Sequence, residues 1–128
     1  MKVLSMLTRV YLPQDELRST ISFYEELLMQ SCSLRFSYAD VGLELAQVGS
    51  VLLIAGSETA LEPFRATHST FVVDGLGEFQ RHLEQAGAQI ISHPRSVPTG
   101  RNMRVVHPDG LVVEYVEHVP AGPGNAIA

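Results

Sequence analysis

The strand and helix signals of this chain of 128 residues occur twice in the same order, at a spacing of about sixty residues. Each half begins with an apolar strand that leads directly into an amphipathic helix. Three short strands with tight turns between them complete each half, and such strands pair antiparallel. The repeated order β-α-β-β-β predicts an α+β fold built from two similar modules.

The first half begins with a strand over Leu4–Tyr11, which Pro13 ends. A helix opens at Gln14-Asp15-Glu16, where acidic side chains complement the helix dipole. Apolar residues then repeat at helical spacing and predict one buried stripe. The stripe consists of Leu17, Ile21, Tyr24 and Leu28. Three strands are expected after the helix, over residues 33–38, 43–47 and 51–55.

The second half begins with Thr67–Val73, where Thr, Phe and Val favour a strand. Asp74 is expected to cap the next helix, Leu76–Ala86, because its carboxylate can accept from free backbone N–H groups. Gly87 is expected just beyond the end of that helix. The remaining strands are predicted over residues 89–92, 102–106 and 111–116, with a proline-containing loop at 93–100.

The chain is long enough for one domain with a buried core. We expect this domain over residues 1–119, with the first module at 1–56, a linker at 57–65 and the second module at 66–119. Residues 120–128 are rich in Pro and Gly and are expected to form a mobile tail. The two modules together predict a curved, mostly antiparallel mixed sheet around a cavity that suits a ligand.

Composition excludes several functional classes. The net charge of −5 argues against a nucleic-acid groove, which needs clustered Lys and Arg. No apolar run approaches the ~20 residues of a membrane span, and the N-terminus lacks the pattern of a signal peptide. Cys32 is the single cysteine and permits no internal disulfide, so we expect a protein of the reducing cytoplasm.

Three stretches resemble motifs of the vicinal oxygen chelate superfamily, which includes glyoxalase I, extradiol dioxygenases and bleomycin-resistance proteins. Ile21–Leu28 is similar to the helix of that family that contains Phe-Tyr. Leu83–Ala88 is similar to the end of its second helix, and His107–Glu114 is similar to its Pro-Asp-Gly turn and last strand. The resemblance extends to Val119 and implies two βαβββ modules and a homodimer. The fold serves both enzymes and binding proteins, so it does not decide between them.

The resemblance also implies a metal site with one ligand from the first and the last strand of each module. His68 and Glu114 fall on the ligand positions of the second module. In the first module the matching positions hold Ser5 and Leu53, neither of which is a competent ligand for a divalent ion. A catalytic metal normally has three protein ligands. Glu44 could supply the third only if its strand faced the cavity.

His68 and Glu114 allow other interpretations. They could hydrogen-bond each other across the cavity, orient an organic ligand, or act as an acid–base pair without a metal. Alternation along the strand places Thr70 on the same face as His68. Arg9 and Arg104 lie in otherwise apolar strands, where each either faces a ligand anion or points outward to solvent.

These observations favour a small-molecule binding or sequestration protein of the bleomycin-resistance type, with a planar or cationic organic ligand and no required metal. The predicted ligand site contains His68, Glu114, Thr70, Arg9, Arg104, Ser5 and Leu53. The alternative is a metal-dependent lyase, isomerase or dioxygenase of the glyoxalase type. There His68 and Glu114 would hold one Ni, Zn, Mn or Fe ion, which would act as a Lewis acid.

Overall fold

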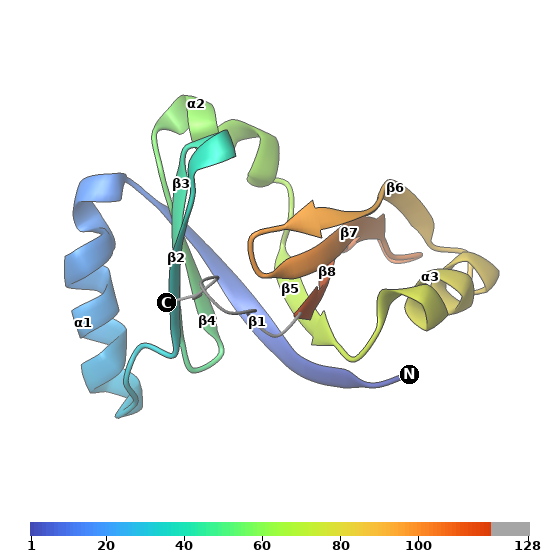
Figure 1. Ribbon diagram of the computed structural model, residues 1–128, viewed down its shortest axis with the longest axis horizontal. Helices are drawn as coiled ribbons and strands as arrows, with labels where there is room; N and C mark the ends of the chain where they lie inside the picture. The colour runs from blue at the N-terminus through green and yellow to red at the C-terminus, as the bar shows by residue number, and fades with distance from the viewer. Residues whose placement is uncertain (119–128) are drawn as a thin grey trace. The chain divides into compact units, whose positions relative to one another are not determined.

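The structure is a computed structural model, and it describes residues 1–118. Figure 1 shows the order of its elements along the chain. The first half comprises β1 (Val3–Leu12), η1 (Gln14–Glu16), α1 (Leu17–Leu28), β2 (Leu34–Tyr38), η2 (Ala39–Val41), β3 (Leu43–Val48) and β4 (Val51–Ala55). Two short helices follow, α2 (Glu58–Leu61) and η3 (Glu62–Phe64). The second half comprises β5 (Ser69–Val73), α3 (Leu76–Gln85), β6 (Gln89–Val97), β7 (Gly100–Val106) and β8 (Val112–His118).

The predicted fold class, two βαβββ modules with mixed strand pairing, is confirmed. The chain divides into two compact units. We call residues 8–66 the first module, and residues 67–118 together with 1–7 the second module. β1 therefore contributes its first residues to the second module and the rest to the first. The segment 57–65, predicted as a linker, contains α2 and η3. The predicted tail at 120–128 lies outside the described residues.

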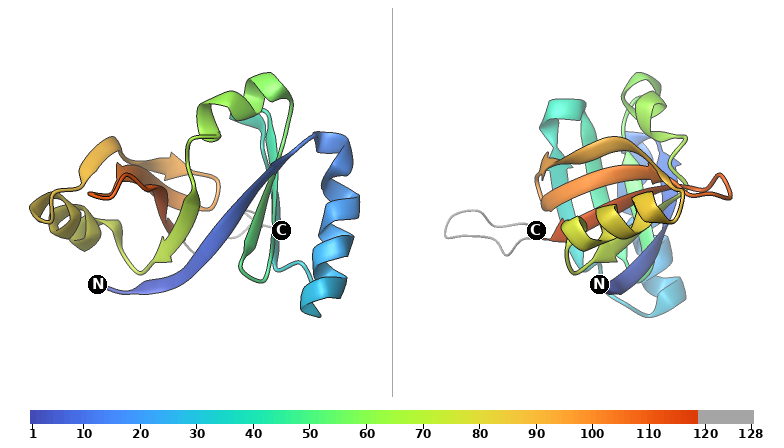
Figure 2. Two further views of the ribbon diagram at one scale, coloured as in Figure 1. Left: turned by 180° about the vertical axis from the view of Figure 1, so that it is seen from behind. Right: turned by 90° about the vertical axis from the view of Figure 1, so that its right-hand side faces the viewer.

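The sheet of the first module has the strand order β2-β3-β4-β1. β1 pairs parallel with β4, whereas β2–β3 and β3–β4 are antiparallel. α1 runs along one face of these strands (Figures 1 and 2) and buries its apolar stripe there. The core beneath the helix consists of Leu12, Leu17, Ile21, Ala46, Val48, Leu53 and Ala55. The stripe predicted from helical spacing is thus the packing face, with Tyr24 and Leu28 at its margin.

The sheet of the second module contains the order β5-β8-β7-β6. β5 pairs parallel with β8, and the other two pairs are antiparallel. α3 packs on one face of this sheet over a core that consists of Val73, Leu76, Phe79, Met103, Val105, Val113 and Tyr115. Because side chains alternate along a strand, the residues between these core positions point to the opposite face. That opposite face carries most of the polar side chains singled out in the sequence.

The start of α3 differs from the prediction. Gly75 occupies the N-cap position and makes no side-chain bond, while the N–H of Leu76 donates to Glu117 Oε1 at 2.9 Å. Asp74 instead accepts from the backbone N–H of Lys2 at 2.9 Å. Asp74 was therefore the wrong cap, because a residue distant in sequence lies closer to the helix end. The predicted end of the helix is confirmed: Gly87 has a left-handed φ of 90° and its N–H donates to Glu84 O.

The predicted loop at 93–100 is also wrong. β6 continues through Pro94 to Val97, with register irregularities between Ile90 and Ser92 and between Ser92 and Arg95. β6 is the last strand in the order of its sheet. A proline is tolerated there because an edge strand leaves every second N–H without a ladder partner.

Candidate functional site

The carboxylate of Glu114 is the most constrained polar group on the face of the second module opposite α3. Glu114 Oε1 accepts from Thr70 Oγ1 at 3.0 Å, and Oε2 accepts from Asn102 Nδ2 at 2.7 Å. Thr70 and Asn102 are buried, with exposed fractions of 2% and 8%. β8 places Glu114 beside β5 and β7, where Thr70 and Arg104 are its direct partners in register. The carboxylate is therefore held in one orientation by neighbours from both sides.

His68 lies just before β5 and is tied to the backbone of Val112. Its backbone N–H donates to Val112 O at 2.8 Å, and its ring atom Nδ1 accepts from the backbone N–H of Val112 at 3.0 Å. Because Nδ1 accepts, the neutral ring carries its proton on Nε2. The exposed imidazole therefore offers a donor to a ligand. His68 and Glu114 do not hydrogen-bond each other in the way that one interpretation of the sequence expected.

The surface around these two side chains combines polar and apolar groups. We call it the Glu114 face and define it by the alternating positions of β5, β7 and β8 that point away from α3. Its apolar members lie beside the polar ones along the same strands. The Glu114 face consists of the side chains of His68, just before β5, and of Thr70, Val72, Asn102, Arg104, Val106, Val112, Glu114, Val116 and His118. Burial lowers the pKa of His118, and the nearby charge of Glu114 opposes that shift.

Asn102 is a site residue that sequence reasoning missed. It was assigned only to the start of a strand, although it lies two positions before Arg104. Alternation along β7 places both residues on the same side, so the candidate status of Arg104 already pointed to Asn102. Its hydrogen bond to Glu114 could not be predicted, because it depends on the register of β7 against β8.

The first module contains positions equivalent to His68, Thr70 and Glu114. Arg9 precedes Leu17, the buried first residue of α1, by the same number of residues as His68 precedes Leu76, the buried first residue of α3. Tyr11 is the register partner of Ile54 in the parallel pair β1–β4, just as Thr70 is the partner of Glu114 in β5–β8. The equivalents of His68, Thr70 and Glu114 are therefore Arg9, Tyr11 and Ile54.

This register corrects two assignments from the sequence. Leu53 is fully buried in the core beneath α1 and does not face a ligand. Ser5 lies two alternations earlier on β1 than Arg9, in the part of the strand that belongs to the second module. Glu44 pairs with Ala55, a residue of the α1 core, so its side chain also points toward α1 and not to the face of Arg9. One-residue errors of register move a side chain to the other face.

Arg9 and Arg65 both contact the aromatic ring of Tyr11 in the first module. Arg9 Cζ lies 5.5 Å and Arg65 Cζ 5.9 Å from the ring centroid. Tyr11 itself is fixed, because its hydroxyl donates to Phe64 O at 2.5 Å. The Nε and Nη1 atoms of Arg9 are inaccessible to solvent and have no hydrogen-bond partner in the described part of the chain.

The donor set does not fit the divalent metal that the resemblance implied. No group of three His, Cys, Asp or Glu side chains within residues 1–118 is placed to hold a metal ion. A metal on Nε2 of His68 would require the ring to protonate Nδ1, which would then face the N–H of Val112. The first-module equivalents, a guanidinium and an isoleucine side chain, supply no metal ligand.

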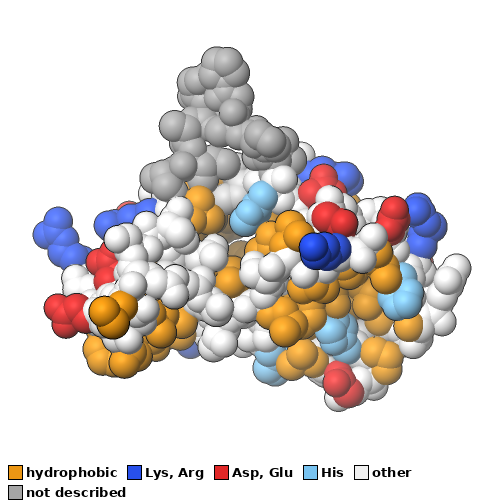
Figure 3. Space-filling view, turned by 90° about the horizontal axis from the view of Figure 1, so that it is seen from below, with side chains coloured by type: hydrophobic (Ala, Val, Ile, Leu, Met, Phe, Trp, Pro, Cys, Tyr) orange, Lys and Arg blue, Asp and Glu red, His pale blue; other side chains and the backbone are white. Residues whose placement is uncertain are grey.

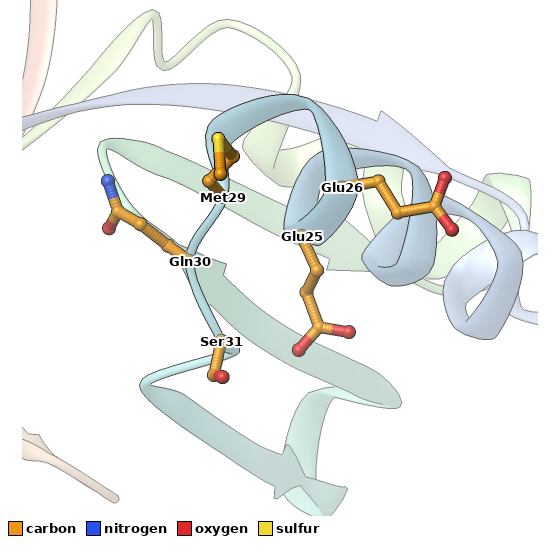
Figure 4. Close-up of a pocket in the computed structure, with 5 residues that line it drawn as sticks. All are labelled: Glu25, Glu26, Met29, Gln30 and Ser31. Atoms are coloured by element: carbon orange, nitrogen blue, oxygen red, sulfur yellow. The ribbon is translucent and has the colours of Figure 1, made fainter.

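A hollow of about 350 Å³ lies at the end of α1 and is lined by Glu25, Glu26, Met29, Gln30 and Ser31. Figure 4 shows that its side chains do not converge: the carboxylate of Glu25 points toward Ser31, and that of Glu26 points away. Glu25 Oε2 accepts from the N–H of Cys32 at 2.8 Å and so fastens the chain that leaves the helix. This hollow is a consequence of the helix end rather than a binding site.

Apart from the single residue Ile91, the large apolar side chains exposed at the surface form two groups (Figure 3 shows one face of the molecule, with hydrophobic groups in orange). One group lies at the start of the chain and the other on α1 and just after it. They are Met1, Val3, Leu4 and Met6, and Phe23, Leu27 and Met29. Among the described residues, no helix has the length and apolar character needed to cross a membrane.

Comparison with known proteins gives strong structural matches. An uncharacterised protein from Methanosarcina mazei is 53% identical, with a TM-score of 0.85 over 93% of this chain and 95% of that chain. Methylmalonyl-CoA epimerase from Mycobacterium tuberculosis is 20% identical, with a TM-score of 0.68 over 92% and 90% of the two chains. A structure titled as Streptomyces coelicolor methylmalonyl-CoA epimerase in complex with 2-nitronate-propionyl-CoA is 15% identical, with a TM-score of 0.64 over 93% and 100%.

No protein-family profile and no curated protein sequence matches the chain. The epimerases are too distant in sequence to show more than a shared fold. That fold, with its two βαβββ modules and mixed strand pairing, agrees with the resemblance found in the sequence. The chain thus belongs to one family with the Methanosarcina mazei protein and has the fold of the vicinal oxygen chelate superfamily.

Proposed function

We propose that this protein binds a small organic ligand at the Glu114 face and requires no metal to do so. The observation that carries the proposal is the hydrogen bond from the N–H of Val112 to His68 Nδ1 at 3.0 Å. It makes Nε2 of His68 a donor toward a ligand, where a metal site would need an acceptor. His68, to which the resemblance assigns a metal ion, is therefore suited to donate a hydrogen bond to an organic ligand.

Glu114 defines the chemistry that this ligand would carry. Each of its oxygens accepts one hydrogen bond from the protein, and an ionised carboxylate can accept about four in all. The side chain is partly exposed, so the remaining lone pairs are within reach of a ligand. A cationic N–H group gives the strongest hydrogen bond to such an acceptor. Val112, which is partly exposed two positions before Glu114 on β8, provides apolar surface for the body of a planar cation.

The fold supports this role as well. Its distant relative from Streptomyces coelicolor is described in complex with a CoA ester, so the architecture accommodates organic ligands. A metal-dependent reaction of the glyoxalase type is the competing function, and the homodimer expected from the resemblance is a further proposal. Sedimentation equilibrium tests the dimer, and a monomeric mass at working concentration would contradict it.

Calorimetric titration of chelator-treated protein with benzamidine, a planar aromatic cation, tests the binding function. We expect saturable binding that Glu114→Gln weakens roughly tenfold, since a charge-assisted hydrogen bond is lost. Glu44→Gln is the matched control, because Glu44 is another partly buried strand carboxylate but points toward α1. Binding that appears only after Zn²⁺, Ni²⁺, Mn²⁺ or Fe²⁺ is added, and that His68→Ala abolishes, would establish the metal-dependent alternative instead.

A further inference from the structure

Arg9 is a half-buried cation, and two nitrogen atoms of its guanidinium have no hydrogen-bond partner in the described part of the chain. Its Nε and Nη1 atoms are closed to solvent and have no partner within the described chain. Native proteins pair nearly all buried polar atoms, and a buried guanidinium is normally matched by an acceptor. The third nitrogen, Nη2, is not among the closed atoms and Arg9 as a whole is partly exposed, so a ligand can approach the guanidinium from the side of Nη2.

The neighbours of Arg9 do not compensate for the missing acceptor. The ring of Tyr11 lies 5.5 Å from Cζ and attracts the positive charge. A ring face, however, is no substitute for oxygen acceptors at the N–H groups. The second guanidinium at the same ring, that of Arg65, adds positive charge. The ion pairs that the described structure shows involve the N-terminal amine with Asp74 and Glu78, and they leave both arginines out.

The position of Arg9 is the one at which the second module places His68. Arg9, Tyr11 and Ile54 repeat the register of His68, Thr70 and Glu114. The first module therefore carries the guanidinium of Arg9 at the position where the second module carries the imidazole of His68. Next to Arg9 lies Leu52, its partner in β4, and Ile54 lies next to Tyr11. Positive charge in the first module is thus set in apolar surroundings.

We infer that Arg9, assisted by Arg65 and the ring of Tyr11, forms a binding site for a negatively charged oxygen group of a small ligand. A carboxylate and a phosphate share this chemistry, because both accept several N–H groups of a guanidinium. The partly exposed ring of Tyr11 favours a carboxylate carried on an aromatic body. The inference uses contacts of the first module alone and does not depend on the proposed function of the Glu114 face.

Calorimetric titrations with three probes, in buffer free of phosphate and carboxylate, test this site. Benzoate carries a carboxylate on an apolar ring, inorganic phosphate is an oxyanion without such a ring, and benzyl alcohol is the uncharged counterpart of benzoate. We expect benzoate to bind saturably and benzyl alcohol not to bind. Phosphate binding as tight as that of benzoate would identify phosphate as the group the site takes.

Variants locate the binding. Arg9→Met is expected to weaken benzoate roughly tenfold or more, because the charge-assisted hydrogen bonds are lost. Arg35→Met is the matched control, since Arg35 is an exposed strand arginine of the same module whose partner, Ala46, lies in the α1 core. Arg65→Gln is expected to weaken benzoate by a smaller factor. Equal benzoate affinity in wild type and Arg9→Met would overturn the inference.

Thermal denaturation of the wild-type protein gives a second readout, which does not depend on whether a variant folds. Benzoate is expected to raise the melting temperature of the wild-type protein, and benzyl alcohol is expected to leave it unchanged. In the anion-free buffer, Arg9→Met is expected to melt at a higher temperature than wild type, because two buried N–H groups without a partner are removed. A wild-type melting temperature that responds to neither benzoate nor phosphate would overturn the site.

Discussion

Thr70 Oγ1 donates a 3.0 Å hydrogen bond to Glu114 Oε1, although 44 positions separate the two residues in the sequence. Parallel pairing of β5 with β8 makes them direct partners. Thr70 is 2% exposed, so its hydroxyl has no water to bond instead. The fold of the second module therefore fixes the carboxylate before any ligand arrives, which reduces the entropy lost on binding.

The Thr70 hydroxyl should contribute measurably to stability. We expect Thr70→Val, which keeps the shape but removes the donor, to lower the free energy of unfolding by about 1–3 kcal/mol. Chemical denaturation measures this change. Thr8→Val, at an exposed position of β1, serves as the control and should alter stability by about 0.5 kcal/mol or less. Equal effects of the two substitutions would show that the bond to Glu114 is not formed.

Glu117, rather than Asp74, should stabilise the start of α3. Glu117→Ala removes the acceptor of the Leu76 N–H, and we expect a loss of about 0.5–2 kcal/mol, as for other helix caps. Asp74→Ala should cost less, because its bond to Lys2 is exposed. Amide hydrogen exchange at Leu76 reports the difference directly. Faster exchange in Asp74→Ala than in Glu117→Ala would contradict the assignment of the cap.

Tyr115 should make the second module sensitive to alkaline pH. Burial raises the pKa of Tyr115 to about 12 from its ordinary value of 10.0, and its hydroxyl lies 2.6 Å from His107 Nε2. The folded state favours the neutral phenol, so its stabilising contribution is complete below pH 10 and is lost as the pH rises toward 12.

Ultraviolet absorbance of tyrosinate measures this titration. One tyrosine should ionise near pH 12 in the wild type, and this late step should be missing in Tyr115→Phe. The free energy of unfolding of Tyr115→Phe should also vary less between pH 10 and 12 than that of the wild type. A wild-type protein without a late-titrating tyrosine would refute the effect of burial.

Leu53 should behave as a core residue rather than as part of a ligand wall. Leu53→Ala leaves a cavity beneath α1, and we expect a loss of about 2–5 kcal/mol. Leu27→Ala, at an exposed position of α1, is the matched control and should cost about 0.5 kcal/mol or less. Benzamidine and benzoate affinities should be unchanged by Leu53→Ala in protein that remains folded. A reduced affinity at unchanged stability would restore Leu53 to the ligand site.

The sequence predicted the architecture because hydrophobic periodicity is a local signal. The helix stripe that begins at Leu17 and the glycine at Gly87 each follow from neighbours within a few positions. The predicted strand ended at Ser92, short of the observed end of β6 at Val97, because Pro94 by itself suggests a loop. Only the position of β6 at the end of its sheet makes the proline acceptable.

The site was predicted less completely, since its contacts depend on register between distant strands. His68, Thr70 and Glu114 were proposed as site residues from the sequence, but their hydrogen-bond partners were not predicted, because pairing of β5 with β8 is not a local property. The same reason explains why Ser5 and Leu53 were matched to the wrong positions. Asn102 escaped notice although alternation with Arg104 pointed to it. For Arg9 the sequence left open whether the side chain faces a ligand anion or solvent. Only the structure shows that two nitrogens of its guanidinium are closed to solvent.

Nitrogen-15 NMR of the His68 imidazole, with and without one equivalent of Zn²⁺, tests the central claim most directly. The resonances of His68 are those that disappear in His68→Ala. We predict the neutral tautomer with the proton on Nε2 and with Nδ1 accepting from Val112, and no change on addition of Zn²⁺. A Zn²⁺-induced shift of the Nε2 resonance to that of a metal-bound nitrogen, saturating at one ion per chain, would contradict the claim.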